Sequence, residues 1–312
     1  MDIIKNHHFV SQFYLRKWSK CGKKVLTTIN NSNIRNMNID KIASSNHLYR
    51  IDNINDETRA ILLKELKKQR LPIMGDLLEQ IINNMSIMNT LKSLYTQNNI
   101  TKEESILKSN TVEGVYGLIE DLAAPLIEKL INNDIEDFDI DDYQNVFRYA
   151  IYQLTRTPKV KNITKEKVEP ILENKNIDYK NYHIIMSLIM SEQMLLTFIE
   201  KLFKITIMEN NTDLNFITND NPIFNIYPIE TNKVKFYLPI SPRKALFFEE
   251  ANIDLKSAIA LKNQILNGKQ YNKYFLDSVE ITREEVLNLN NRMKENSDRF
   301  LFLYEEQDLV NT

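Results

Sequence analysis

Cysteine is nearly absent from this sequence, because the chain of 312 residues contains only one, Cys21. A single cysteine cannot form an internal disulfide, and a structural zinc site built on several cysteines is excluded. Such cysteine usage is typical of reducing compartments, so we expect a cytoplasmic protein.

Glycine and proline are scarce as well, with 5 and 8 residues. Turn-rich sandwiches and barrels need more of both, whereas the many Leu, Ile, Lys and Glu residues favour helices. Because 43% of the residues are hydrophobic, the chain can bury a sizeable core.

The sequence also has neither a strong excess of charge nor a long apolar run. Its formal net charge is −2, which excludes a protein that coats nucleic acid non-specifically, so contact with nucleic acid or a nucleotide needs a local basic patch. The first residues lack the apolar core of a signal peptide, and runs such as MLLTFI are too short to cross a bilayer. We therefore expect a protein without a membrane partner.

The signatures of several common enzyme classes are missing. The sequence has no Walker loop, no glycine-rich dinucleotide turn, no His-Glu-x-x-His motif and no serine nucleophile elbow. Cys21 lies in KCGKK, which is typical of an exposed turn, so it is a poor candidate for a catalytic thiolate. The familiar enzyme classes therefore find no support.

Hydrophobic periodicity predicts a single α+β domain over residues 1–312, predominantly helical. A helical period from about 56 to 210 predicts a helical body that begins with a cap at Asn55 or Asp56. Apolar and aromatic runs in the ranges 24–51 and 214–249, among them KKVLTTI and HLYRI, predict small antiparallel β-structure. Helices near 253–267 and 282–297 and a last strand, RFLFLYEE, complete the prediction.

The stretch KNHHFVSQFYLRKW, residues 5–18, contains the first candidate site. Written as a helix over 7–18, it places aromatic side chains on one side and His8, Gln12 and Arg16 in a stripe on the other. A proton-transfer group, an amide and a fixed cation on one surface suit a catalytic or anion-binding site. The alternative is a terminal helix whose polar side faces water.

Two charged stretches have opposite signs. Residues 5–24 hold six Lys and Arg residues and no acid, a local excess that attracts anions. Residues 134–142, DIEDFDIDD, hold six carboxylates but lack the glycine and the twelfth-position glutamate of a calcium loop. We interpret the acidic stretch as a solvated loop and helix start.

Two further candidates lie in turns of the C-terminal third. In FITNDNPIF, Pro222 restricts the chain so that Asp220 is presented at a strand end, where a carboxylate suits catalysis; an Asx-turn is the equal alternative. In LPISPRKALFF, a tight turn at 241–243 displays Arg243, which either holds a phosphate or carboxylate in a two-pronged contact or is an exposed turn residue.

The remaining candidates lie on helices. Gln153 and Arg156 in YQLTRTP share one face because they are three residues apart. Glu120 in GLIEDLAAP lies on a strongly apolar helix, where a buried carboxylate needs a partner, and Arg156 is a credible one. The alternative is that Glu120 and Arg156 form a purely structural buried pair.

Six stretches, in this order, resemble a bacterial family known as domain of unknown function 4238: NHHFVSQFYLRKW, LIEDLAAPLIEKL, YQLTRTP, FITNDNPIF, LPISPRKAL and LNNRMKENSDRFLF. The likeness covers nearly the whole chain, although proline is usual in the family where Ser11 stands and serine where Asn219 stands. The resemblance implies no reaction, since the family's activity is not established. It implies that the six stretches belong together and that their polar residues converge: His7, His8, Gln12, Arg16, Glu120, Gln153, Arg156, Asp220 and Arg243.

A cleft with histidine, carboxylates and several arginines suits cleavage of a phosphodiester. We therefore expect a phosphodiesterase-like hydrolase, a nuclease acting as a toxin or antiviral effector. Its catalytic groups, or ligands of a divalent metal ion, would be His8, Glu120 and Asp220, and its substrate-binding residues His7, Gln12, Arg16, Gln153, Arg156 and Arg243. The alternatives are a non-catalytic sensor that binds a nucleotide or another anion, and an interaction protein whose aromatic N-terminal helix docks on a protein partner.

Overall fold

The computed structural model describes residues 2–30, 32–69, 71, 74–94, 100–173, 175–252 and 276–309. The chain forms two compact units. The first comprises Met1–Phe9, Ser44–Ile119 and Thr155–Leu195, and the second comprises Val10–Ala43, Glu120–Leu154 and Leu196–Thr312. Because these stretches interleave, no single cut in the chain separates the units, and the expectation of one domain stays a prediction. The expected α+β class is confirmed.

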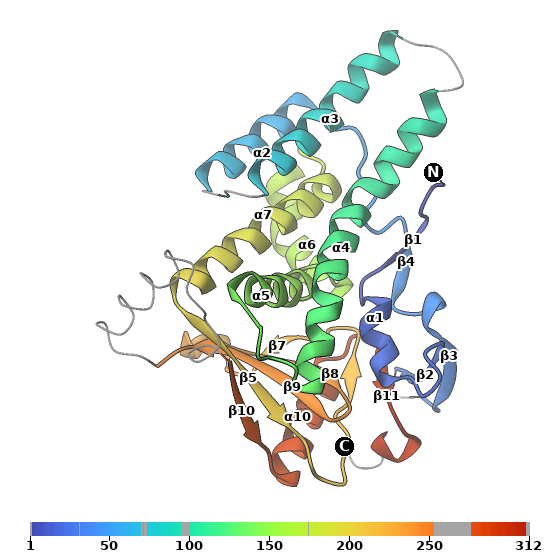
Figure 1. The fold of residues 1–312 in the computed structure, drawn as a ribbon. Coiled ribbons are helices and arrows are strands. Elements are labelled where there is room, and N and C mark those ends of the chain that lie inside the picture. The colour runs from blue at the N-terminus through green and yellow to red at the C-terminus, as the bar shows by residue number, and fades with distance from the viewer. Residues whose placement is uncertain are drawn as a thin grey trace. The chain divides into compact units, whose positions relative to one another are not determined.

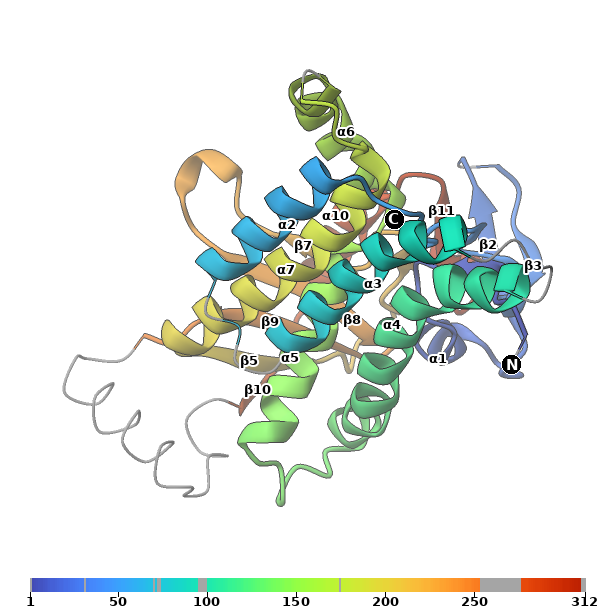
Figure 2. The ribbon, with the colours of Figure 1, turned by 90° about the horizontal axis from the view of Figure 1, so that it is seen from above.

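The first unit is helical, with one short strand pair. Its helices are α2 (Asp56–Lys68), α3 (Gly75–Leu94), the first part of α4 (Ile100–Asn132), α6 (Pro158–Glu173) and most of α7 (Tyr179–Glu200). Figures 1 and 2 show α2, α3 and α7 next to one another. Strands β1 (Asn6–His8) and β4 (Ser44–Asn46) pair antiparallel, with His7 opposite Ser45.

Helix α2 shows how the local sequence sets an element of this unit. The Asn55 side chain accepts a hydrogen bond from the backbone N–H of Thr58 at 2.9 Å, which satisfies one of the free donors at the helix start. Acidic residues occupy the first turn and lysines the last, as the helix dipole favours. The predicted cap is therefore confirmed, and it is Asn55.

The second unit contains two sheets. The order of the larger is β10 (Leu276–Glu280), β5 (Phe203–Glu209), β9 (Lys244–Glu250), β8 (Lys235–Ser241) and β7 (Phe224–Asn225), and only β10 and β5 are parallel. The order of the smaller is β3 (Arg35–Asn38), β2 (Lys24–Ile29), β11 (Phe300–Leu303) and β6 (Thr218–Asn219), all antiparallel. Helices α1 (Gln12–Leu15), α10 (Arg283–Asn296) and the main part of α5 (Ile140–Thr155) belong to the same unit.

Helix α10 joins the two sheets of the second unit into one core. It begins with a capping box between Thr282 and Glu285, so its start is set locally. Its apolar residues belong to one buried cluster with residues of both sheets: Met208, Tyr237 and Ala245 from the larger sheet, Leu301 and Leu303 from the smaller, and Val286, Leu289 and Met293 from α10. The predicted helix near 282–297 is thus confirmed, whereas that at 253–267 lies outside the described residues.

The prediction of one helix over 7–18 was wrong. Residues 6–8 form a strand, and the helical part is limited to α1 and the short 3-10 helix Arg16–Trp18. Strand pairing with β4 removes His7 and His8 from the helix, and Ser11 is extended, with its hydroxyl 2.9 Å from that of Tyr149 rather than capping α1. The predicted apolar side is nevertheless buried, with Tyr14 at 0% and Trp18 at 1% exposure.

Other boundaries were also wrong. HLYRI is a turn rather than a strand, because β4 ends at Asn46 and His47 has a positive φ of 54°. The helical body does not reach residue 210: Leu202, at φ 57°, ends the helical segment and the next residues form β5 between β9 and β10. Pro125 lies inside α4 without ending it. Pro158 follows the end of α5 and begins α6.

Among the described helices, α7 is long and apolar enough, by length and composition alone, to cross a membrane. Of its apolar stretch, 44% is buried inside the structure. The core helix of a water-soluble protein meets the same criteria, so this is weak evidence, and the absence of a membrane partner stays a prediction.

Candidate functional site

His7 is a buried structural residue of the first unit. Its exposure is 0%, and its ring stacks on Tyr49 with centroids 5.6 Å apart. The backbone N–H of Tyr49 donates to Nδ1 at 2.9 Å, so Nε2 carries the proton and lies 3.0 Å from the carbonyl oxygen of Ile4. Burial lowers the pKa of His7, which keeps the ring neutral. This arrangement favours a structural role over substrate binding.

The expected stripe of His8, Gln12 and Arg16 is divided between two elements. His8 ends β1 in the first unit, whereas Gln12 begins α1 in the second. Arg16 and Gln12 do share a face, since Nη2 of Arg16 donates to Oε1 of Gln12 at 3.2 Å. The stripe as a single helical surface was therefore wrong, but its last two members lie together as predicted.

Asp220 holds the turn before strand β11. It is 3% exposed, and its carboxylate accepts hydrogen bonds from the backbone N–H groups of Asp298, Arg299 and Phe300 at 2.9, 2.8 and 3.0 Å. Burial raises the pKa of Asp220, and the three N–H groups oppose that rise. With both oxygens engaged by backbone donors, the carboxylate is suited to fixing this turn rather than to catalysis.

Arg243 is also engaged by backbone. Its Nη1 donates to the carbonyl of Leu214 at 3.2 Å and to that of Thr212. The guanidinium therefore connects the β8–β9 turn to the segment before β6. This contact favours a structural role over the predicted two-pronged hold on a phosphate.

The remaining predicted residues lie in both units. Gln153 is buried at 1% exposure and Glu120 is half-buried, both in the second unit. Arg156 belongs to the first unit. The pairing of Glu120 with Arg156, and one cleft containing His8, Arg156 and Asp220, stay predictions. In the described part of the chain, no three His, Cys, Asp or Glu side chains are grouped so that they could hold a metal ion.

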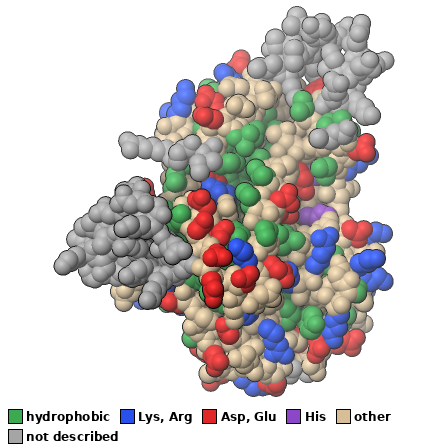
Figure 3. Space-filling view, in the orientation of Figure 1, with side chains coloured by type: hydrophobic (Ala, Val, Ile, Leu, Met, Phe, Trp, Pro, Cys, Tyr) green, Lys and Arg blue, Asp and Glu red, His purple; other side chains and the backbone are tan. Residues whose placement is uncertain are grey.

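Charged side chains of the second unit gather in two places on the face shown in Figure 3. Lys and Arg side chains lie over β2 and β3, and acidic side chains lie around the loop before α5. The predicted basic stretch is partly neutralised, because Lys17 pairs with Glu128 and Lys20 with Glu305. The acidic stretch is an exposed loop and helix start, as predicted.

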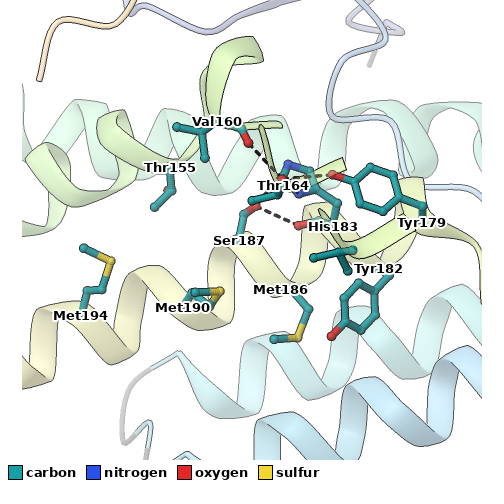
Figure 4. A pocket seen from close by; sticks show the side chains of 11 residues that line it. Thr155, Val160, Thr164, Tyr179, Tyr182, His183, Met186, Ser187, Met190 and Met194 are labelled. Atoms are coloured by element: carbon teal, nitrogen blue, oxygen red, sulfur yellow. Dashed lines mark hydrogen bonds between the residues drawn. The ribbon is translucent and has the colours of Figure 1, made fainter. Parts of the chain in front are cut away.

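A cavity of the first unit, between α6 and α7, is a candidate site for a small molecule. Its volume is about 190 Å³, which exceeds the roughly 150 Å³ of an apolar cavity that binds benzene. Three methionines of α7 at four-residue spacing form much of its wall, and Figure 4 shows them along one side of that helix. The full lining is Thr155, Val160, Thr164, Val168, Tyr179, Tyr182, His183, Met186, Ser187, Met190 and Met194.

Hydrogen bonds set the orientation of His183 in this cavity. The Thr164 hydroxyl lies 2.9 Å from the carbonyl of Val160 in its own helix and 3.1 Å from Nδ1 of His183. We assign its single proton to the carbonyl, so that it accepts from Nδ1. Ser187 donates to the carbonyl of His183 at 2.8 Å and lies 3.5 Å from Nε2. The ring therefore carries its proton on Nδ1, and Nε2 is an acceptor at the cavity wall.

His183 is neutral at physiological pH. Burial lowers its pKa to about 4, and the charge of Lys161 acts in the same direction. Tyr179 stacks on the ring with centroids 5.5 Å apart, which holds it in place. A histidine with so low a pKa is a weak general base, so it supplies a hydrogen-bonding group rather than a proton shuttle.

A smaller hollow of the first unit shares part of its lining with this cavity and is lined by Arg156 among others. The two spaces share Thr155, His183 and Ser187. Arg156 is 5% exposed, with its guanidinium 5.1 Å from the ring centroid of Tyr116, and its carbonyl accepts from the Tyr49 hydroxyl at 3.0 Å. Arg156 is thus the one predicted site residue that lines this smaller hollow, and none of the predicted residues lines the cavity itself.

None of the residues that line the cavity was predicted from the sequence, although their spacing is a signal there. His183 and Ser187 are four residues apart, as are Met186, Met190 and Met194, so each set shares a face of α7. A histidine and serines on an apolar helix mark polar positions that need partners. His183 has its partner, Thr164, on α6, whereas Ser187 bonds within its own helix.

Comparison with known proteins supports the family and no particular activity. The family described as "Protein of unknown function (DUF4238)" matches residues 6–306. The chain therefore belongs to this family, as its six ordered stretches indicated. No curated protein matched the chain, and no solved structure matched it either.

Proposed function

We propose that this protein is a ligand-binding module whose helical unit holds a small molecule in the cavity between α6 and α7. The observation that carries this proposal is the cavity itself, about 190 Å³ in volume, with a mainly apolar wall and one oriented acceptor, Nε2 of His183. A largely apolar pocket with a few convergent polar groups is the usual form of a small-molecule site.

The surroundings of the chemical groups favour binding over catalysis. His183 is a weak base because burial lowers its pKa to about 4. Asp220, the predicted catalytic carboxylate, is engaged by three backbone N–H groups. These observations support the non-catalytic alternative, in which the cavity senses a ligand, and phosphodiester cleavage stays a prediction to be tested separately.

Direct binding of a neutral aromatic probe tests the proposal. We expect 2-naphthamide to bind the purified protein with one-to-one stoichiometry, as followed by its fluorescence and by calorimetry. The Ser187→Phe variant places a ring in the cavity and should weaken binding at least tenfold. Because that variant adds bulk beside a buried helix face, Met190→Glu is the second probe: Met190 lines the cavity but is 52% exposed, so folding should survive.

A matched control distinguishes cavity binding from adsorption to the surface. Ile171 lies on α6, is 57% exposed and does not line the cavity, so Ile171→Phe should leave the affinity unchanged. If the probe fails to bind, or if the cavity variants bind as tightly as this control while remaining folded, the proposed function is wrong.

A further inference from the structure

The wall of the cavity between α6 and α7 carries no charge. Among the described residues that line it, none is Lys, Arg, Asp or Glu. His183 could gain a charge, but it stays neutral because burial lowers its pKa to about 4. An ion in this cavity would lose its hydration without gaining an opposite charge, so the wall favours a neutral ligand.

The hydroxyl protons of this wall are already engaged by the protein. Each Ser, Thr or Tyr hydroxyl has a single proton to donate. That of Tyr179 goes to the carbonyl of Lys161 at 2.9 Å, and that of Ser187 goes to the carbonyl of His183 at 2.8 Å. Thr164 donates to carbonyls of its own helix. These three hydroxyls can therefore accept a hydrogen bond from a ligand but have no proton left to donate.

Two further hydroxyls line the cavity. Ser191 donates to the carbonyl of Ser187 at 2.7 Å, so the Thr155 hydroxyl, 2.7 Å from that of Ser191, is the donor of this second pair. In Figure 4 the ring of Tyr182 extends away from His183, and the charges that act on its hydroxyl belong to α2. Apart from Tyr182, the described hydroxyls of the wall therefore present lone pairs rather than protons.

Nε2 of His183 is the acceptor of this wall that lacks a good donor among the described residues. The ring carries its proton on Nδ1, where Thr164 accepts it at 3.1 Å. The hydroxyl of Ser187 lies 3.5 Å from Nε2, at the outer limit of a hydrogen bond, and its proton goes to a carbonyl. A partly buried acceptor without a donor is unfavourable, so a ligand that donates to Nε2 gains from this arrangement.

From this arrangement we infer that the ligand is a neutral aromatic molecule with a hydrogen-bond donor, of the phenol or indole class, which donates its O–H or N–H to Nε2 of His183. The inference rests on the proposed binding function. Methionine sulfur atoms make favourable contacts with aromatic rings, and Met186, Met190 and Met194 line this cavity. A molecule that only accepts hydrogen bonds would leave Nε2 without a donor and would place its own lone pairs against those of the wall.

Indole and benzofuran test the chemical class, because they have nearly the same size and shape and differ by an N–H in place of a ring oxygen. We expect the purified protein to bind indole at least tenfold more tightly than benzofuran, as measured by calorimetry. In protein with isotope-labelled histidine, indole should move the Nε2 resonance of His183 in the direction of a nitrogen that accepts a hydrogen bond, and benzofuran should not. His183→Gln identifies that resonance among those of the four histidines.

Two variants locate the acceptor. His183→Phe keeps a ring against Tyr179 and removes Nε2, so the preference for indole should fall below about twofold. Tyr182→Phe is the matched control, because it removes a hydroxyl from the same lining, and it should retain the full preference.

Equal affinity of the wild-type protein for indole and benzofuran, or an Nε2 resonance that indole leaves unmoved, would overturn the inference. A preference that survives in folded His183→Phe, or that is lost in folded Tyr182→Phe, would overturn it too. If 2-naphthamide binds in the cavity and indole does not, the inference is wrong and the proposed function stands. Failure of all three molecules to bind would reject both proposals.

Discussion

His183 and Thr164 are in contact at the wall of the cavity, with Nδ1 of the ring 3.1 Å from the threonine hydroxyl oxygen. Because that hydroxyl donates to backbone carbonyls of α6, the contact fixes the tautomer of a neutral histidine. The same contact connects a residue of α7 to one of α6. It therefore helps to define both the shape of the cavity and the chemistry of its wall.

The low pKa of His183 predicts an effect on stability in mildly acidic solution. The unfolded chain takes up a proton near the ordinary value of 6.5, whereas the folded ring resists it until about 4. The unfolded state therefore binds more protons in this interval, and the free energy of unfolding falls as the pH falls from 6.5 to 4. Above pH 6.5 the ring is neutral in both states, so the free energy of unfolding carries no penalty from His183 there.

Chemical denaturation at about pH 7 and about pH 4.5 measures this effect. Between these conditions the wild-type protein should lose about 2 kcal/mol more than the His183→Gln variant, which cannot take up the proton. An equal loss in the two proteins would show that His183 titrates normally in the folded state.

Replacing Asp220 by Asn should destabilise the second unit. The carboxylate accepts three backbone N–H bonds through its two oxygens, whereas the amide of Asn has one accepting oxygen and one donating NH2 group. At least one of the three N–H groups therefore loses its partner. We expect a loss of about 2–4 kcal/mol in urea denaturation. Asp298→Asn is the control, because that side chain is exposed, and it should change the stability by less than about 0.5 kcal/mol. A fully stable Asp220→Asn protein would contradict the structural role.

Tyr14 makes buried hydrogen bonds in the second unit that can be tested by substitution. Its hydroxyl lies 2.7 Å from that of Thr218 and donates to the carbonyl of Pro239 at 2.7 Å, at 0% exposure. Tyr14→Phe should cost about 1–3 kcal/mol, because both partners remain buried without it. Thermal and urea unfolding measure the change. Tyr227, which is 38% exposed, is the matched control, and its replacement by Phe should be nearly neutral.

The two adjacent histidines should differ in their effect on stability. His7→Ala removes a fully buried ring that stacks on Tyr49 and accepts its N–H, so we expect a loss of about 2–4 kcal/mol. His8 is only partly buried, and His8→Ala should change the stability by about 1 kcal/mol or less. Melting curves of the two variants measure the difference. Similar losses of stability would contradict the structural role of His7.

His8→Ala also tests the predicted nuclease. If His8 transfers a proton or binds a metal ion, the folded variant should lose any cleavage of RNA or DNA, or any cellular toxicity, by about two orders of magnitude or more. Incubation of the wild-type protein with mixed RNA and DNA, with and without a chelator, gives the reference. Unchanged cleavage by folded His8→Ala would reject the catalytic interpretation of the N-terminal stretch.

The elements that depend on neighbouring residues could be predicted from the sequence alone. The cap at Asn55, the helix that follows it and the helix near 282–297 depend on interactions within a few residues, so their pattern is visible in the chain. The burial of Tyr14 and Trp18 followed from spacing, and the family from the order of six stretches.

Tertiary structure decided the rest, because the deciding partners lie far apart in the chain. Strand β1 exists because residues 6–8 pair with 44–46, and β5 because it lies between β9 and β10, whatever the local helical tendency. For Asp220 the sequence left a catalytic carboxylate and an Asx-turn as equal alternatives, and only the fold brings the N–H groups of 298–300 to the carboxylate. Likewise, the low pKa of His183 depends on its burial and on Lys161, an environment that exists only once α6 and α7 have packed together.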